Sequence, residues 1–402
     1  MTARIDRHLT RVLGGLLLAS LLAGTAARAA SDFGARGEPA AQQTPAAGAE
    51  GSKPKKNPLL KLAQPWPSAE ELRRHKDEAE ARALFSSADP IAFTLVGDFK
   101  TINKDHDPKS AKRYPGELRV ARPDGRTDAI PVQLSARGHV RRMAQTCDFV
   151  PLRVEFSKEL VKDTLFDGQT TLKLVVQCRT TGEYEQYVLR EYLAYRIFNL
   201  LSPRSLKARL AKVTYVDSTT DKAMGTRYGM FLEHDSDLAR RMEGRTVEIP
   251  RAVFKDVDAD ALETMMIFAY MIGHTDFSIY ALHNVILVQT PDRMLHTIPY
   301  DFDISGLVHP PYAIPGRGLP IKTVQERFFR GPCRTQDQVE PILANFNSKK
   351  ASVLGLLDTI PGIDRTSRQD ARAFLDGFYS TITNQGDVKR LFVEKCSKAP
   401  GM

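Results

Sequence analysis

The sequence predicts an α+β fold with two lobes, a β-rich lobe that contains one long helix and a mainly helical lobe after it. Three observations predict this arrangement. Residues 91–176 alternate short apolar stretches with turn signals, as antiparallel strands do. Residues 184–201 change to the period of a helix, and the chain after residue 237 consists mainly of helix-like segments and loops. We therefore expect two lobes with a cleft between them.

Composition agrees with a folded chain. The protein has 402 residues, and 42% of them are hydrophobic, which is enough for a sizeable core. The 57 Lys and Arg residues against 48 Asp and Glu residues give a formal net charge of +9. Nucleic-acid-binding proteins concentrate basic residues on one face, whereas this small excess is spread along the whole chain. We therefore expect no nucleic-acid partner.

The N-terminal residues 1–29 are typical of a secretory signal peptide. Three arginines precede an apolar run at residues 12–23, and small residues follow at 27–29. The run is too short to span a bilayer, and no later run reaches the roughly 18 apolar residues of a membrane helix. The sequence thus predicts an exported protein, periplasmic or extracellular, with no transmembrane segment in the mature chain.

The next two segments lead into the folded part. Residues 30–57 are rich in Ala, Gly, Pro, Gln and Ser, which is typical of a flexible linker. Residues 58–86 contain a charged helix that begins with a capping box at Ser68 and Glu71, and we expect it on the surface. The β-rich lobe is then predicted at 87–235 and the mainly helical lobe at 236–402.

The strands and the long helix of the first lobe can be placed individually. The helix at 184–201 has two apolar faces and is ended by Ser202 and Pro203. The predicted strands are 91–96, 117–121, 129–136, 150–156, 171–176, 211–216 and 228–233.

The second lobe begins with a helix that Asp258 can cap. Its core, residues 265–272, is apolar on all sides and ends at Gly273, as expected of a buried central helix. A polar loop follows at 274–282. Two short strands, 284–289 and 294–298, are joined by a turn and predict a hairpin.

The four cysteines are expected to form two disulfides, because an exported protein folds in an oxidising compartment. We favour Cys147 with Cys178 and Cys333 with Cys396, since each pair then stays within one half of the chain. Zinc binding is the alternative, but no two of the cysteines have C-x-x-C spacing.

Polar residues that could carry chemistry gather around the predicted hairpin. Its pairing sets Asn284 across from Pro299, so that Asn284 and Asp301 lie at the same end, and Asp276 reaches that end from the preceding loop. An amide and two or three carboxylates, Asp303 included, form an oxygen-ligand site that suits Mg²⁺ holding substrate phosphates. A remaining carboxylate could orient or deprotonate a nucleophile.

Two other interpretations of these residues stay open. Asp and Asn in loops commonly cap helices and make turns without binding anything. His274 and His283 could instead bind zinc together with Asp301, although their spacing matches no common ligand pattern.

Glu191 is a second candidate, because a carboxylate on an apolar helix face needs a partner. Lys173 lies in the preceding strand and could supply the positive charge, and Arg153 could do the same. The alternative is that Lys173 is an ordinary solvated strand residue, and the sequence does not decide which of Lys173 and Arg153 would face a ligand.

The order of these features resembles the protein-kinase-like fold, and most closely the spore-coat-protein-H-like (CotH) family of secreted atypical kinases. The resemblance covers roughly residues 90–310. It is carried by Lys173, by Glu191 eighteen residues later, and by three short segments: 229–233 (Gly-Met-Phe-Leu-Glu), 273–276 (Gly-His-Thr-Asp) with Asn284, and 299–303 (Pro-Tyr-Asp-Phe-Asp).

The resemblance implies a role for each matching residue. Lys173 would position the phosphates of ATP and form an ion pair with Glu191, and Asp276 would be the catalytic base. Asn284 and Asp301 would hold Mg²⁺ or Mn²⁺, with Asp303 adding a ligand or tying down the loop. Backbone groups near Glu233 would meet the adenine.

The chain departs from the kinase pattern at the loop that covers the phosphates. There is no G-x-G-x-x-G, and residues 137–139 (Arg-Gly-His) are the nearest equivalent. The basic side chains of Arg137, Arg141 and Arg142 would substitute for the missing backbone contacts.

We therefore expect a secreted kinase that transfers a phosphoryl group from ATP to an exported protein or small molecule. One alternative is a non-catalytic, kinase-shaped binding or structural protein of the cell envelope, which the scarcity of ATP outside the cytoplasm favours. A metal-dependent hydrolase using the same carboxylates is another.

Overall fold

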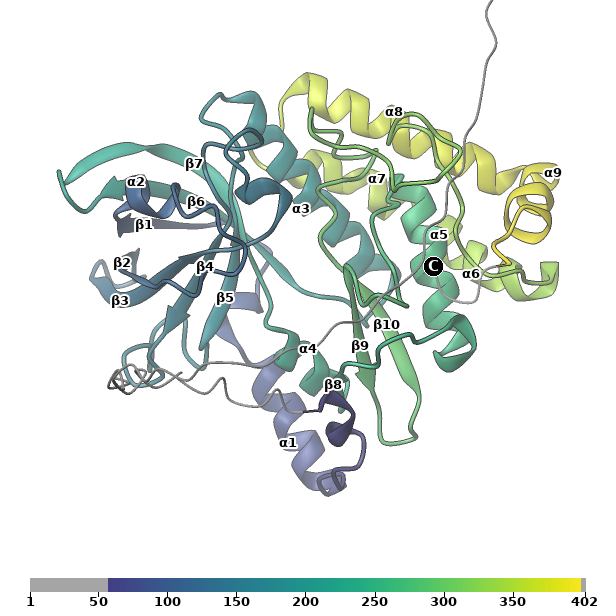
Figure 1. The fold of residues 1–402 in the computed structure, drawn as a ribbon, viewed down its shortest axis with the longest axis horizontal. Coiled ribbons are helices and arrows are strands. Elements are labelled where there is room, and N and C mark those ends of the chain that lie inside the picture. Colours follow the sequence, from purple (N-terminus) through teal and green to yellow (C-terminus); the bar gives the residue numbers. More distant parts are fainter. Residues whose placement is uncertain (1–56, 399–402) are drawn as a thin grey trace, which may run out of the picture. The chain divides into compact units, whose positions relative to one another are not determined.

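Seven strands close into a barrel, in the order β1-β2-β3-β4-β5-β7-β6 (Figure 1). Neighbouring strands run antiparallel, with one exception. β1 and β6 pair in parallel and thereby close the barrel. The strands are β1 (Ile91–Gly97), β2 (Tyr114–Ala121), β3 (Thr127–Ala136), β4 (Leu152–Phe156), β5 (Thr171–Val175), β6 (Ala208–Asp217) and β7 (Lys222–Leu232).

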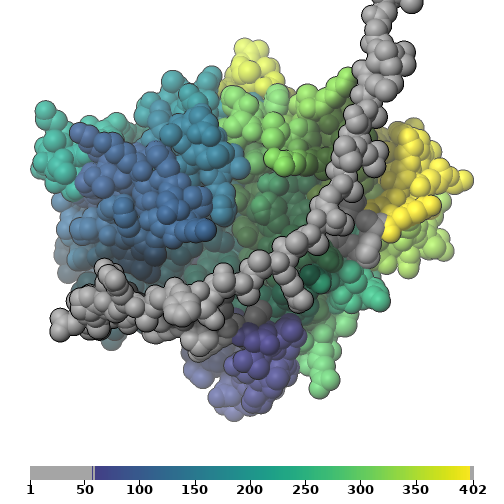
Figure 2. All heavy atoms as spheres, viewed as in Figure 1, coloured from purple at the N-terminus to yellow at the C-terminus, as the bar shows by residue number. Residues whose placement is uncertain are grey.

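The computed structural model describes residues 57–398, all of which belong to the unit Lys56–Met402. The predicted signal peptide (1–29) and all but the last residue of the predicted linker (30–57) lie outside the described residues. Within the unit, the blue and teal atoms of the barrel lie mainly on one side, and the green and yellow atoms of the residues after β8 (Arg245–Val247) lie mainly on the other (Figure 2).

The interior of the barrel is a packed apolar core. Along β3, buried Ile130, Val132 and Leu134 alternate with more exposed residues, as expected when one face of a strand points inward. The rings of Phe93 and Phe231 stack inside at 5.3 Å between centroids. Because side chains fill the barrel, ligands can be bound only around its rim and outer surface.

The predicted fold class is wrong. The structure has a closed seven-stranded barrel and mixed α/β content, in place of the protein-kinase-like fold of two lobes with a mainly helical second lobe. After the barrel, a three-stranded antiparallel sheet in the order β10-β9-β8 lies among the helices. No local signal reveals the closure, because β1 and β6 are far apart in the sequence and a parallel pair needs no tight turn.

The long helix α3 (Glu183–Leu201) confirms the helix predicted at 184–201. It is buried on more than one face, and it contacts β6 and β7 of the barrel as well as the helices α5, α7 and α8. The helix ends at Ser202, directly before Pro203, which cannot continue it. Because α3 touches both the barrel and the C-terminal helices, its buried polar residues lie where the two meet.

The predicted hairpin is confirmed, one residue from the expected register. β9 (Val285–Gln289) pairs with β10 (Leu295–Pro299), and Val285 rather than Asn284 lies opposite Pro299. Both strands are buried along their whole length. Asn284 and Asp301 therefore flank the same end of a rigid hairpin.

Two further predictions about helices are confirmed. The buried central helix is found as α5 (Ala259–Ile272), and Gly273 ends it in a left-handed conformation (φ 65°), which glycine adopts without strain. The capping box at Ser68 is also present. The other helices are α1 (Ala69–Glu80), α2 (Phe99–Ile102), α4 (Asp235–Arg241), α6 (Gln336–Ser348), α7 (Lys350–Thr359), α8 (Arg365–Thr383) and α9 (Gln385–Val388), with a π-helical turn at Lys389–Glu394 and 3-10 turns at Pro58–Lys61, Ala83–Phe85, Val140–Arg142 and Phe254–Asp256.

Both predicted disulfides are present. Cys147 is bonded to Cys178 and Cys333 to Cys396, so the zinc alternative for the cysteines is wrong. The first bond ties the segment after β3 to the segment after β5. Two disulfides are compatible with an exported protein. Across residues 57–398, no helix is both long and apolar enough to cross a membrane.

Candidate functional site

Lys173, in β5 of the barrel, lies next to the end of the β9–β10 hairpin. Its Nζ atom is 3.5 Å from Asp235 Oδ1 and 4.5 Å from the centre of the Tyr300 ring. Burial lowers the pKa of Lys173 and repulsion from Arg137 adds to this, whereas attraction to Asp235 and Asp301 opposes it. The barrel and the hairpin thus meet at Lys173, which has both acidic and basic side chains around it.

Asp301 and Asn284 are held in unusual backbone conformations. Their φ angles are 62° and 52°, a left-handed region that non-glycine residues rarely occupy. The amide N–H of Asp301 donates to the hydroxyl of Tyr195 (2.9 Å), and that of Tyr300 donates to the carbonyl of Asn284 (3.1 Å). Strained backbone of this kind is frequent at functional sites, where the surrounding structure fixes it.

Three carboxyl groups, those of Glu191, Asp301 and Asp303, influence one another in a largely buried place. Burial, followed by repulsion from Asp303 and Asp301, raises the pKa of Glu191 well above its usual range. Burial and repulsion from Asp301 raise the pKa of Asp303 to about 7. Glu191 Oε1 has no hydrogen-bond partner within the described part of the chain. Extra positive charge would therefore stabilise this group of carboxyls.

Arg141 supplies part of that positive charge. The side chain is buried, donates to the carbonyl oxygen of Val176, and attracts Glu191 and Asp303. Tyr312 Oη donates to Asp303 Oδ2 at 3.4 Å from the same side. Lys173 forms its ion pair with Asp235, and among the described residues no ion pair joins Lys173 to Glu191. The Lys173–Glu191 ion pair implied by the resemblance is thus not found. Arg141 is instead a positive charge that attracts Glu191.

Asp276 lies in a polar group of its own beside the hairpin. Its Oδ1 is 3.1 Å from His283 Nε2, and Asn284 Nδ2 donates to its carbonyl (2.7 Å) and to its Oδ2 (3.3 Å). The hydrogen bond with His283 lowers the pKa of Asp276 and raises that of His283. Asp276 is therefore ionised at neutral pH, and the histidine bonded to it, His283, has a raised pKa.

A cavity of about 270 Å³ opens beside Lys173. Arg153 lies directly opposite Lys173 in the register of β4 and β5, and both side chains line the cavity with Glu233, His234 and Asp235. Glu233 is committed elsewhere, because its carboxylate binds Arg241 (2.7 Å) and its N–H donates to the carbonyl of Lys207 (2.9 Å). The backbone N–H of Glu233 is therefore occupied, and the prediction that backbone groups near Glu233 meet adenine stays a prediction.

A second cavity of about 270 Å³, rich in basic side chains, shares Arg153 with the first. Arg113, Arg137 and His139 contribute to it. Arg142 also lines it, but its guanidinium is buried and forms an ion pair with Asp105 at 2.8 Å. The prediction that Arg142 covers phosphates is thus wrong, whereas Arg137 and Arg153 face open space.

The described residues contain no group of three or more His, Cys, Asp or Glu side chains that could together hold a metal ion. The zinc alternative built on His274, His283 and Asp301 is therefore wrong, and burial lowers the pKa of His274 to about 4. The predicted ligands Asn284, Asp301 and Asp303 offer two carboxylates and an amide. Mg²⁺ typically takes one or two protein carboxylates and completes its coordination with phosphates and water, so this smaller set still fits it.

Four contacts of the site were not predicted from the sequence. Asp235 and Tyr300 contact Lys173, Tyr312 bonds Asp303, and His283 bonds Asp276. The sequence indicates His283 only as a zinc ligand, and Tyr300 only as part of the segment 299–303. Asp235 and Tyr312 could be found only from the tertiary structure.

In comparisons with known proteins, no protein family matches the chain, and no curated protein matches it.

Proposed function

We propose that this protein is a phosphotransferase that binds ATP with Mg²⁺ or Mn²⁺ and passes a phosphoryl group to a hydroxyl or carboxylate of an exported protein or small molecule. The position of Asp301 carries the proposal. Its carboxylate attracts Lys173 of the barrel and repels the buried carboxyls of Glu191 and Asp303. Near Asp301, Lys173 would thus complement the negative phosphate oxygens, and the carboxyl groups would complement a divalent cation.

The cavity beside Lys173 supports nucleotide binding. Lys173 and Arg153 project from adjacent strands toward the same space, and Arg137 adds a third cation that acts on Lys173. Lys173 and Arg153 line one cavity, and Arg153 and Arg137 line the second, so three basic side chains are available to a chain of phosphate groups. They would do the work that backbone N–H groups of a glycine-rich loop do elsewhere.

The raised pKa values of Glu191 and Asp303 support a bound cation. Asp301, with Asp303 or Asn284, would hold the ion, which when bound would neutralise charge on the transferring phosphoryl group. Asp276 is ionised and partly exposed, so it can accept the proton of an acceptor hydroxyl. As that oxygen bonds to the γ-phosphorus, the bond from this phosphorus to the bridging oxygen breaks and ADP leaves.

The order of motifs supports the reaction class, because it resembles that of the CotH-like secreted kinases. The fold expected from that resemblance is not found, so the support comes from the residues alone. Two disulfides are compatible with the exported setting.

Thermal unfolding of the full exported chain with ATP, with and without Mg²⁺ or Mn²⁺, tests the proposal. A ligand that binds only the native state stabilises it by about 2.7 kcal/mol at a hundredfold excess over its Kd. We expect ATP with metal to raise the Tm, and Lys173→Met to abolish the rise. Lys212→Met, which removes an exposed lysine of β6, is the matched control and should keep it.

An unchanged Tm at millimolar nucleotide with either metal would contradict the proposal. It would favour a second candidate, a non-catalytic binding or structural protein. One observation supports that candidate, because Arg141 already gives Glu191 and Asp303 an internal counter-charge.

A further inference from the structure

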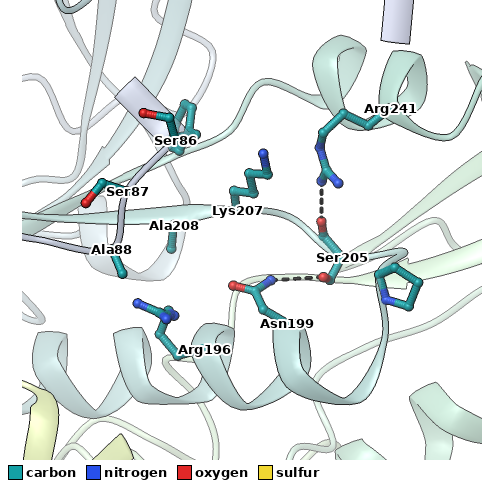
Figure 3. Close-up of a pocket in the computed structure, with 11 residues that line it drawn as sticks. Ser86, Ser87, Ala88, Arg196, Asn199, Ser205, Lys207, Ala208 and Arg241 are labelled. Atoms are coloured by element: carbon teal, nitrogen blue, oxygen red, sulfur yellow. Dashed lines mark hydrogen bonds between the residues drawn. The ribbon is translucent and has the colours of Figure 1, made fainter. Parts of the chain in front are cut away.

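A separate cavity of about 360 Å³ lies between α3, α4, the start of β6 and the segment 85–88 (Figure 3). Three basic side chains line it. Arg196 comes from α3, Lys207 precedes β6, and Arg241 ends α4. Neither Lys173 nor any residue of the acidic group lines this cavity, so the function proposed above leaves it unexplained.

Only one of the three cations is neutralised. Arg241 binds the carboxylate of Glu233 with its Nε and Nη2 atoms, both at 2.7 Å, and also donates to the carbonyl of Ser205. Arg196 donates to the hydroxyl of Tyr192 (2.9 Å). Within residues 57–398, no carboxylate oxygen lies within 4.0 Å of Arg196 or Lys207, and Lys207 Nζ has no hydrogen-bond partner.

The lack of a partner for Lys207 is costly, because its side chain is only partly exposed. Burial lowers its pKa and repulsion from Arg241 adds to this, while Glu233 and Glu80 attract it from beyond ion-pair distance. Asp89 directly follows the lining segment 85–88, and its carboxylate accepts a hydrogen bond from Ser87 Oγ (2.8 Å). Two cations without a bonded anion that face one open cavity would be stabilised by a bound anion.

Polar groups around the cavity are held in place. Asn199 Nδ2 donates to Ser205 Oγ and to the carbonyl of Leu206, both at 2.9 Å, which fixes the amide beside Arg196 (Figure 3). The hydroxyl of Ser205 in turn donates to the carbonyl of Ser202. Figure 3 shows Arg196 reaching from α3 toward Ala88, and Lys207 between Ser86 and Arg241 with its amino group directed away from α3. A preorganised basic cavity of this kind suits a tetrahedral anion.

We infer that this cavity binds a small anionic molecule through a phosphate or sulfate group, and that Lys207 and Arg196 supply positive charge from two parts of its lining. Its volume exceeds that of a single phosphate, so the ligand can carry a further small polar part. The inference does not rest on the proposed transfer reaction, because the two cavities share no basic side chain.

Isothermal titration calorimetry of the full exported chain tests the inference. The probes are inorganic phosphate and sulfate, with chloride at equal ionic strength as the control for screening. We expect saturable binding that Lys207→Gln or Arg196→Gln weakens by about tenfold or more, the effect of losing one charge-assisted hydrogen bond. Lys212→Gln removes the same charge from the surface of β6, and it should leave the affinity unchanged.

The Lys173→Met variant separates this site from the nucleotide cavity and should bind phosphate as the parent protein does. Loss of binding in Lys173→Met alone would assign the anion to the other cavity and overturn the inference. Equal weakening of phosphate binding in Lys207→Gln and Lys212→Gln would also overturn the inference, because it would indicate diffuse electrostatic attraction. A lack of saturable binding would overturn it as well. If circular dichroism shows that Lys207→Gln or Arg196→Gln does not fold, the phosphate affinity of the other variant still tests the inference.

Discussion

The carboxyl of Asp303 titrates in an unusual range, because burial and Asp301 raise its pKa to about 7. A carboxyl with a raised pKa binds its proton more tightly in the folded than in the unfolded state. The free energy of unfolding therefore falls as the pH rises from the unfolded pKa, about 4, toward 7. We expect Asp303→Asn to flatten this fall, so that the variant gains at least about 1 kcal/mol relative to the parent between pH 4 and 8.

Urea unfolding at several pH values measures this effect. Asp292→Asn is a suitable control, because Asp292 is an exposed carboxyl with a lowered pKa and should not flatten the fall. Parallel pH profiles for Asp303→Asn and the parent would mean that Asp303 is not the titrating group.

Asp301 combines a backbone and a side-chain role that two substitutions can separate. Its φ of 62° costs a non-glycine residue roughly 1–2 kcal/mol, which glycine does not incur. We therefore expect the free energy of unfolding of Asp301→Gly to exceed that of Asp301→Ala by about 1 kcal/mol. Both should lose the stabilisation by ATP and metal, because both lack the carboxylate. Retention of that stabilisation in either variant would remove Asp301 from the proposed cation site.

Asp276 is the proposed proton acceptor, and His283 holds it in place. Asp276→Asn should abolish phosphoryl transfer while leaving the Tm shift by nucleotide largely intact. Asp256→Asn, at the 3-10 turn Phe254–Asp256 and outside the proposed site, is the control and should transfer at the parent rate. A transfer rate in Asp276→Asn equal to that of the parent would show that another group accepts the proton.

At the scale of elements, the Cys147–Cys178 disulfide anchors the segment that carries Arg141. This segment has only a short 3-10 turn (Val140–Arg142), and Cys147 and Cys178 are 31 residues apart. Chain entropy alone predicts that breaking a loop of this size costs roughly 3–4 kcal/mol. We expect Cys147→Ser with Cys178→Ser to lose that stability and also to weaken the Tm shift by ATP, because Arg141 would no longer be held against Glu191.

The second disulfide provides the comparison. Replacing Cys333 and Cys396, 63 residues apart, should cost a similar or slightly larger free energy of unfolding. That double variant should keep the nucleotide effect, because its cysteines lie near the C-terminal π-helical turn. Equal loss of the nucleotide effect in both double variants would indicate general destabilisation rather than a role for the Arg141 segment.

At the scale of the whole molecule, the sequence predicted the local elements well and the architecture poorly. The seven barrel strands, α3, α5 and the hairpin have local signals in the form of alternation, helical period and turn residues, whereas the short elements α2, α4 and β8 were not predicted. The closure of the barrel has none, because it depends on β1 meeting β6 across the whole sheet. This is why the expected fold class was wrong although most of its longer elements were found.

The candidate site divides in the same way. The meeting of Asn284 with Asp301 could be predicted, since a hairpin fixes which residues share an end. The partner of Lys173 could not, because Asp235 follows β7, and β7 lies beside β5 only in the assembled sheet. Arg141 is likewise brought to Glu191 by a segment with little regular structure.

The ion pair between Glu233 and Arg241 joins a residue of one cavity to a residue of another. Glu233 lines the one that holds Lys173, and Arg241 lines the one that holds Lys207. The backbone of Lys207 also exchanges hydrogen bonds with Glu233. An anion that drew Arg241 away from Glu233 would free a carboxylate next to the first cavity. Any such coupling must be reciprocal, so ATP in one cavity would change the affinity of the other for phosphate by the same factor.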